Sequence, residues 1–323
     1  MNEILTLLIP IFGLIAFGYV TALRNWLGAN ATTVLNRFVL RLALPAELFQ
    51  ITATLPLSDL RHAGFTSAFA LGMMATFALG WIWDWGRPAT TAHRLSGAAI
   101  EGLAAGYANT AFMGIPICLS VFGAHVNAAL TISNLLTVCL LMAGVILLIE
   151  IEEQEKTAGG SAFGRVMKGL SLNPLVFAPL AGLAWNAAAL PLPAGISRFM
   201  TMLGDSASPC ALVTIGLFLA ETRDQPAPFG AVLRVSLLKL FVQPLLTVLA
   251  AIYLFALPTL WVEEALVLSA LPTGTGPFML AQLYDREAAI ASRATLLTTI
   301  VSIATLAGIL AWIGPHPAAQ AVP

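Results

Sequence analysis

Apolar residues run along most of this chain in stretches of roughly 20 residues, the length that spans the hydrocarbon core of a bilayer as a helix. Short polar segments separate these stretches, so each stretch predicts a membrane-spanning helix. Ten helices are expected, at residues 4–23, 31–52, 62–83, 96–122, 128–151, 173–190, 197–220, 230–256, 261–284 and 288–312. The pattern therefore predicts an all-α integral membrane protein in a lipid bilayer.

Two of these stretches are interrupted near their centres by residues that break helices. The fourth contains Asn109–Pro116 (Asn-Thr-Ala-Phe-Met-Gly-Ile-Pro), and the ninth contains Leu271–Pro277 (Leu-Pro-Thr-Gly-Thr-Gly-Pro). Proline removes a backbone donor and glycine loosens the helix, so an unbroken membrane helix would not carry them together. Pro116 and Pro277 are 161 residues apart, which is half of this 323-residue chain. Broken helices at matching places of two halves are typical of a transporter binding site.

Other residues recur at nearly the same spacing. Arg37-Phe38 in the second helix recurs as Arg198-Phe199 in the seventh, and Gly18 in the first recurs as Gly182 in the sixth. Because each half has an odd number of helices, the second half crosses the bilayer in the opposite direction. The expected organisation is a first five-helix repeat at residues 1–152, a linker at 153–165 and a second repeat at 166–323.

The positions of Lys and Arg orient the helices, because cytosolic loops carry more of these residues. With the N-terminus outside, only Arg61 and Arg198 lie in outer loops. The cytosolic ends carry Arg24, Arg87, Arg94, Lys156, Arg165, Lys168, Arg223, Arg234, Arg286 and Arg293. Both termini are therefore expected outside, with the central linker in the cytosol.

Composition excludes several classes of function. Of all residues 59% are hydrophobic and 10% are charged, the net charge is −1 and the mean hydropathy is +0.88. A soluble domain carries roughly 25% charged residues. There is no basic stripe for nucleic acid. Cys118, Cys139 and Cys210 have no partners at metal-ligand spacing, so neither a metal nor a cofactor is expected.

An intramembrane protease is the main enzyme alternative. Tyr284-Asp285 and Leu203-Gly204-Asp205 superficially resemble the paired aspartates of such proteases, but their order along the chain is reversed. The sequence contains neither HExxH nor GxSxG, so no enzyme is expected. A passive channel and, less favoured, a sensor remain as alternatives to a transporter.

Both interruptions lie roughly 20 Å into their helices, near the bilayer midplane. Broken backbone is tolerated there only where it is buried in protein or lines a cavity. The free N–H groups at the start of a half-helix suit a carboxylate. The predicted substrate-binding residues are Asn109, Thr110, Gly114, Pro116, Pro272, Thr273, Gly274, Thr275, Gly276 and Pro277.

Ionisable residues within membrane helices are costly and usually face a cavity or a partner. Asp205 and Glu101 are candidates for ion or proton coupling, with a structural charge as the alternative for each. Arg37 and Arg41 share one helix face at a depth similar to Glu101, which predicts a structural Arg–Glu pair or interfacial snorkelling. Other charged residues within the helices, Glu47 and Lys239, are expected to be bundle-facing or amphipathic.

Four segments carry a resemblance to a known family. Asn109–Pro116 resembles the Asn-Thr-x-x-Met-Gly-Ile-Pro segment of PIN-type auxin efflux carriers, and Ser269–Phe278 resembles the matching segment of their second half. Leu42–Pro45 and Leu203–Pro209 are similar to bacterial members of the wider auxin efflux carrier (AEC) family. The resemblance covers all ten predicted helices, although the central linker is much shorter than the hydrophilic loop of plant carriers.

The resemblance implies a ten-helix fold like that of bile-acid and sodium/proton transporters, in which a crossover domain moves against a scaffold domain, usually in a homodimer. We therefore expect a secondary active transporter of a small organic anion, such as a dicarboxylate or an auxin-like carboxylic acid. It would lie in a bacterial inner membrane and be driven by membrane potential or coupled to H⁺ or Na⁺.

Overall fold

The computed structural model describes residues 2–55, 61–85, 94–155, 174–221 and 227–314. Within these ranges the chain is helical apart from its turns and one isolated antiparallel bridge, between Ala108 and Thr273. The helices long and apolar enough to cross a membrane span Ala63–Trp83, Asn127–Glu153, Ala194–Glu221, Phe229–Leu254 and Ala289–Ile313. Shorter apolar helices span Phe12–Leu23 and Pro174–Ala187. The predicted all-α class is confirmed.

The helices of the first half begin and end close to the predicted boundaries. They are α1 (Asn2–Leu23), α2 (Ala31–Phe38), η1 (Val39–Ala43), α3 (Leu44–Ala53), α4 (Ala63–Trp85), α5 (Arg94–Gly106), η3 (Thr110–Gly114), α6 (Ile115–Phe122), η4 (Gly123–Val126), α7 (Asn127–Asn134), η5 (Leu135–Met142) and α8 (Ala143–Glu155). Helix α8 continues beyond the predicted end of the fifth helix, and most of the predicted linker lies outside the described residues.

The second half also contains long helices and one interrupted helix. Its elements are α10 (Pro174–Ala187), α11 (Ala194–Gly204), α12 (Ala207–Glu221), α13 (Phe229–Leu237), η6 (Leu238–Val242), α14 (Gln243–Leu249), η7 (Ala250–Leu254), α15 (Thr259–Ala270), α16 (Gly276–Leu283) and α17 (Ala289–Ile313). Elements η1, η3, η5, η6 and η7 are π-helical turns that continue the neighbouring α-helices.

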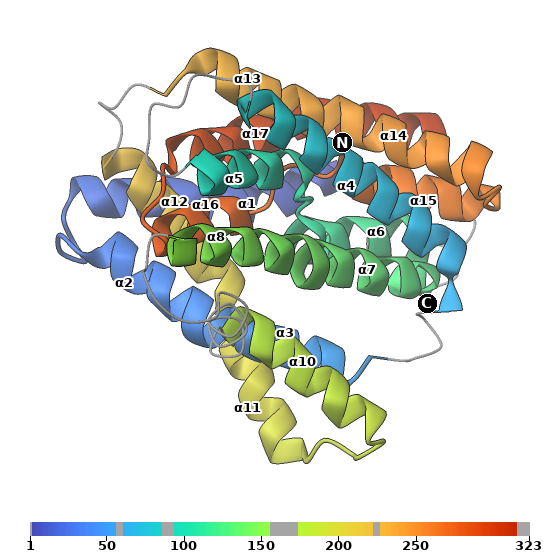
Figure 1. Ribbon diagram of the computed structural model, residues 1–323, viewed down its shortest axis with the longest axis horizontal. Helices are drawn as coiled ribbons and strands as arrows, with labels where there is room; N and C mark the ends of the chain where they lie inside the picture. The colour runs from blue at the N-terminus through green and yellow to red at the C-terminus, as the bar shows by residue number, and fades with distance from the viewer. Residues whose placement is uncertain (1, 56–60, 86–93, 156–173, 222–226, 315–323) are drawn as a thin grey trace.

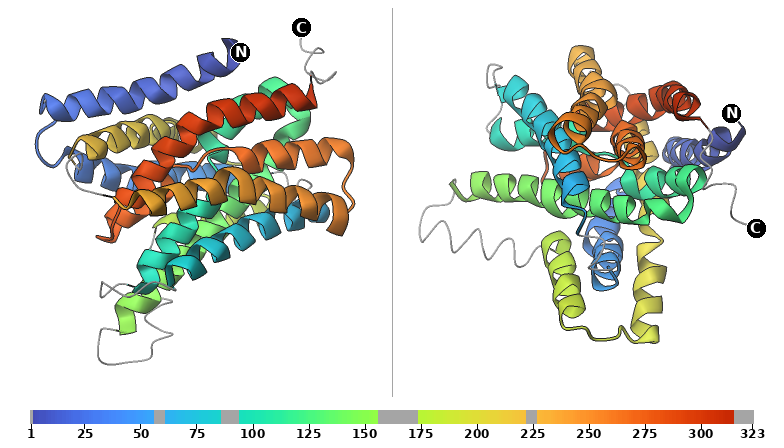
Figure 2. Two further views of the ribbon diagram at one scale, coloured as in Figure 1. Left: turned by 90° about the horizontal axis from the view of Figure 1, so that it is seen from above. Right: turned by 90° about the vertical axis from the view of Figure 1, so that its right-hand side faces the viewer.

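The helices pack in two groups (Figures 1 and 2). In the first, α1 lies along α12, α2 also contacts α12, and α3 packs between α10 and α11. In the second, α4 packs on α5 and α14, α5 packs on α8, and α13 and α15 pack on α17. We call them the α3 group (α1–α3 and α10–α12) and the α5 group (α4–α8 and α13–α17). The interrupted helices both belong to the α5 group.

Glycines allow the helices of the α3 group to approach closely. A Cβ atom added to Gly18 of α1 would lie 2.2 Å from the carbonyl oxygen of Val213 in α12. A Cβ atom added to Gly182 of α10 would lie 2.0 Å from the hydroxyl oxygen of Thr52 in α3. Small residues at such contacts are typical of helix pairs in membranes, where van der Waals packing drives association.

Candidate functional site

The two interruptions predicted from the sequence meet in space. Residues 107–109 separate α5 from η3, and residues 271–275 separate α15 from α16. Within this crossing the Asn109 N–H donates to the Pro272 carbonyl oxygen at 2.9 Å, and the Gly274 N–H donates to the Tyr107 carbonyl oxygen at 3.0 Å. Segments from opposite halves of the chain therefore satisfy part of each other's backbone hydrogen bonding, as non-helical backbone at membrane depth requires.

The first interruption begins earlier in the chain than predicted. The chain is helical again from Thr110, because a π-helical turn leads into α6. In this turn the Gly114 N–H donates to the Asn109 carbonyl oxygen at 3.0 Å, and the Ile115 N–H donates to that of Thr110. Pro116 then falls in the first turn of α6, where the missing backbone N–H group of a proline is tolerated. Gly114, although it is among the predicted binding residues, therefore has no free amide to offer a substrate in this structure.

The second interruption is held by threonine hydroxyls. The Thr273 N–H donates to the Thr298 hydroxyl oxygen at 3.1 Å, and the Thr273 hydroxyl donates to the Ala104 carbonyl oxygen at 2.9 Å. The Thr295 hydroxyl donates to the Gly274 carbonyl oxygen at 3.3 Å. Thr273 is fully buried. In this structure its polar groups hold the crossing together and are not free for a substrate.

Two side chains one turn apart cap the C-terminal ends of the half-helices that enter the crossing. Gln243 donates from Nε2 to the carbonyl oxygen of Gly106, at the end of α5, at 3.0 Å. Lys239 is fully buried and donates from Nζ to the carbonyl oxygen of Ser269, near the end of α15, at 2.7 Å. A cation at this position complements the partial negative charge of a helix C-terminus. Lys239 is thus bundle-facing, one of the two alternatives expected for it.

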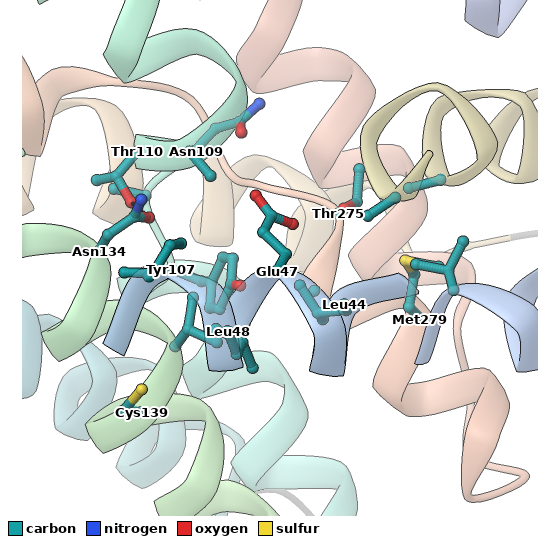
Figure 3. Close-up of a pocket in the computed structure, with 18 of the residues that line it drawn as sticks. Leu44, Glu47, Leu48, Tyr107, Asn109, Thr110, Asn134, Cys139, Thr275 and Met279 are labelled. Carbon is teal, nitrogen blue, oxygen red and sulfur yellow. Dashed lines mark hydrogen bonds between the residues drawn. The ribbon is translucent and has the colours of Figure 1, made fainter. Parts of the chain in front are cut away.

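A pocket opens where the crossing faces the α3 group (Figure 3). It contains about 640 Å³ of space between atoms, including space open to solvent, but the centre of a water molecule can reach only about 30 Å³ of it, so the pocket would have to widen to admit a solute. The α3 group contributes Val39, Leu44, Glu47, Leu48, Ile51, Ala207 and Ala211. The α5 group contributes Tyr107, Ala108, Asn109, Thr110, Ala111, Asn134, Leu135, Val138, Cys139, Thr275, Gly276 and Met279. This crossing pocket is therefore apolar over most of its wall and has a few polar groups.

The predicted binding residues divide between this wall and the crossing behind it. The four that line the pocket are Asn109, Thr110, Thr275 and Gly276. Those that form the crossing or the helix starts beside it are Pro272, Thr273, Gly274, Gly114, Pro116 and Pro277. The half-helices that begin at Thr110 and Gly276 both start at the pocket. The Thr110 N–H donates to the Ala108 carbonyl oxygen at 2.9 Å, whereas the first-turn N–H groups of Ala111 and Gly276, which line the pocket, have no partner within their own helix. The partial positive charges of both helix N-termini are therefore directed to the crossing pocket.

Three further polar residues line the pocket and were not among the predicted binding residues. Asn134 of α7 accepts a hydrogen bond on Oδ1 from the Thr110 hydroxyl at 2.7 Å. Tyr107 presents its ring beneath α16. Glu47 of α3 directs its carboxylate between Asn109 and Thr275 (Figure 3). A polar residue inside an apolar stretch is the signal in each case, but the sequence does not show which helices face one another.

None of the charged candidates belongs to the described lining of this pocket. Asp205 is exposed at the end of α11. Glu101 is buried and forms an ion pair with Arg234 of α13. The predicted pairing of Glu101 with the arginines of the second helix is therefore wrong, because α13 packs on α5 and brings Arg234 to it. Arg37 and Arg41 are exposed.

A second cavity, of about 1000 Å³ including open solvent, lies beyond the crossing pocket. It is lined by Thr33, Asn36, Arg37, Phe218, Gln282, Leu283, Asp285, Arg286, Glu287, Ala288 and Ala289. Asn36 donates from Nδ2 to the carbonyl oxygen of Met279 at 3.1 Å, and Met279 also lines the crossing pocket. The two spaces are thus separated by this contact between α2 and α16.

Comparison with known proteins places this geometry in context. A family model described as "Membrane transport protein" matches residues 3–310. A protein of Rhizobium meliloti (strain 1021) named "Putative malonate transporter" is 31% identical over 322 residues, which cover 96% of each chain. The "Lysosomal cholesterol signaling protein" of Mus musculus is 26% identical over 250 residues, which cover 74% of this chain and 29% of that protein.

Proposed function

This chain belongs to the membrane transport protein family, and we propose that it is a secondary active transporter of a small organic anion. Family membership confirms an integral membrane protein that moves a small molecule, as the resemblance to auxin efflux carriers implied, and not an enzyme. The class of substrate and the mechanism are the proposal. The observation that carries it is the meeting of two half-helix starts at one pocket between two groups of helices.

A short dicarboxylate suits the crossing pocket. Its carboxylate would accept hydrogen bonds from the first-turn N–H groups of Ala111 in η3 and Gly276 in α16 and from the side-chain amide of Asn109. The Thr275 hydroxyl supplies another donor on the opposite side of the pocket. The relative of 31% identity carries malonate in its name, which makes malonate the first substrate to test.

We further propose that residues 1–152 and 166–323 form inverted repeats. The contact of Gly18 with Val213 has a counterpart in the contact of Gly182 with Thr52. Gly182 follows Gly18 by 164 residues, and Val213 follows Thr52 by 161. These are the spacings at which other residues recur in the sequence. The pairing of the two interruptions with each other also supports a twofold relation between the halves.

Alternating access would follow from movement of the α5 group against the α3 group, since the crossing pocket has walls from both. The second cavity would be the vestibule on the cytosolic side, with both termini outside. The protein would lie in a bacterial inner membrane, as a homodimer.

Uptake of radiolabelled malonate by the purified protein in liposomes tests the proposal, with Asn109→Ala as the key variant. Loss of a hydrogen bond to a charged ligand costs about 1.5–3 kcal/mol. Affinity should therefore fall between about tenfold and about a hundredfold. Asn127→Ala, at an exposed position at the start of α7, is the matched control and should bind as the wild type does. Wild-type protein that transports no dicarboxylate would contradict the proposal.

A further inference from the structure

Glu47 is the one acidic residue on the described wall of the crossing pocket. It lies in the first turn of α3, and the backbone of α11 packs directly on it, because a Cβ atom added to Gly204 would lie 3.1 Å from its Cα. Its carboxylate is directed into the pocket between Asn109 and Thr275 (Figure 3). The Oε2 atom is buried and has no hydrogen-bond partner among the described residues.

The charged groups around Glu47 do not neutralise it. Asp205 follows Gly204, whose backbone packs against Glu47, and it adds a charge of the same sign, whereas Tyr107 shares the pocket wall with Glu47. On the elements packed against α3, Arg41 of η1 and Arg198 of α11 are exposed, and α10 has no titratable side chain. Cys139 lies on the facing wall. No Lys, Arg or His belongs to the described lining of the pocket.

An ionised Glu47 would repel the anion for which the two half-helix starts are suited. Two like charges in a mostly apolar pocket are strongly unfavourable, since the surroundings screen them weakly. Neutralising Glu47 with a bound cation removes this repulsion. Binding of the cation and binding of the anion must then favour each other, because coupling between two ligands is reciprocal.

Na⁺ at broken helices is bound by unwound backbone carbonyl groups, and several such groups at this crossing are already occupied. Its carbonyl oxygens already accept hydrogen bonds from protein donors, as the structure shows for Ala104, Gly106, Tyr107, Ser269 and Pro272. The Lys239 ammonium group already lies at the end of α15. Of the side-chain oxygens on the wall, that of Thr110 is oriented by its bond to Asn134. A proton, unlike Na⁺, needs only one oxygen of the Glu47 carboxylate, so the pocket suits a proton better than Na⁺.

We infer that Glu47 carries a proton that enters and leaves the crossing pocket together with the anion, which makes the transporter a proton–anion symporter. The inference rests on the function proposed above. On the side where the pocket is open, the Glu47 carboxylate takes a proton from water and the anion binds. On the other side the anion leaves and the proton returns to water, so no other reactant is consumed.

The test measures malonate binding and the accompanying proton uptake by the purified full-length protein in weakly buffered solution. For the wild type, affinity should fall at least about fivefold between about pH 6 and about pH 8, because the protonated form of Glu47 binds the anion and is lost as the pH rises. Glu47→Gln copies the protonated form of Glu47. Its affinity for malonate should therefore stay, at every pH tested, near the value that the wild type has at low pH. Any pH dependence of malonate itself is common to both proteins.

In liposomes Glu47→Gln should still exchange malonate for malonate, but an imposed proton gradient should no longer drive accumulation. Asp205→Asn removes a like charge near Glu47, so it should move the pH dependence toward lower pH without abolishing it, and Glu47→Asp should also retain a pH dependence. Equal pH dependence in the wild type and Glu47→Gln would overturn the inference. So would malonate binding to the wild type without proton uptake, even if Glu47→Gln fails to fold. If no dicarboxylate binds to the wild type at any pH, the proposed function itself fails.

Discussion

At the crossing, individual residues pack so closely that a larger side chain cannot replace glycine without moving its neighbours. The ring of Tyr107 lies against the backbone of the second interruption, where a Cβ atom added to Gly274 would lie 2.9 Å from ring atom Cε1. One added to Gly276 would lie 2.7 Å from Cζ. Real Cβ atoms do not approach so closely, because proteins are close-packed and such overlaps force movement of the backbone. Glycine at these two positions therefore sets the distance between the two half-helices.

Gly276→Ala should accordingly displace the start of α16 from the pocket. A misplacement of about 1 Å can lower the rate of a process that depends on geometry by about a hundredfold, so malonate uptake should fall strongly. Gly144→Ala in α8 is the control, because nothing lies within 4 Å of the added Cβ atom. Uptake in liposomes, normalised to the amount of folded protein, measures both. Near-normal uptake by Gly276→Ala would show that the crossing tolerates displacement.

At the scale of the helices, the sequence predicts where elements lie better than how they meet. Runs of apolar residues located the helices, because length and composition alone decide what can cross a bilayer. The start of the first interruption was misplaced, since the π-helical turn before Pro116 depends on which hydrogen bonds the surroundings favour. The pocket residues Glu47, Tyr107 and Asn134 were not predicted because they become neighbours only when separate helices pack.

The partner of Glu101 could not be predicted either, because it lies on a separate helix that becomes a neighbour only on packing. The ion pair that Glu101 forms allows a direct test of how these helices pack. Glu101 of α5 and Arg234 of α13 form an ion pair whose side chains are 10% and 12% exposed. Removing one member of a buried pair strands the other charge and costs about 3–5 kcal/mol. Glu101→Leu alone should therefore lower the Tm markedly. Glu101→Leu combined with Arg234→Met should recover most of the loss.

Thermal unfolding of the purified single and double variants would measure this coupling. If the two single substitutions lower the Tm additively, with no recovery in the double variant, the pair does not link α5 to α13. Because α5 ends at the crossing, loss of the pair should also reduce uptake. Wild-type uptake with a lowered Tm would limit the pair to a structural role.

At the scale of the whole molecule, the helices of the α3 group and the α5 group pack as two bodies (Figure 1), and residues of both line the crossing pocket. A site with walls from two bodies can be opened to either side when one body moves against the other. The family of membrane transport proteins and the division into two packed groups agree with this arrangement. The homodimer and the orientation of the termini remain predictions from the family resemblance and from the positions of Lys and Arg.

The central claim is that the transported anion binds in the crossing pocket, and a native cysteine there offers a direct test. Cys139 lines the pocket, whereas Cys210 lies outside its described lining and Cys118 is buried. A Cys118→Ser, Cys210→Ser variant leaves Cys139 as the only thiol in the chain. The rate at which a small thiol reagent modifies Cys139 can then be measured with increasing malonate. A variant that retains only Cys210 is the control.

Bound malonate should slow modification of Cys139 severalfold, with half-protection at the concentration that half-saturates uptake. Modification of Cys210 should not change. Asn109→Ala should shift protection of Cys139 to higher malonate concentrations, in parallel with its weaker uptake. If a variant that transports malonate showed the same rate of Cys139 modification with and without saturating malonate, the anion would bind elsewhere and the account of the crossing pocket would be contradicted.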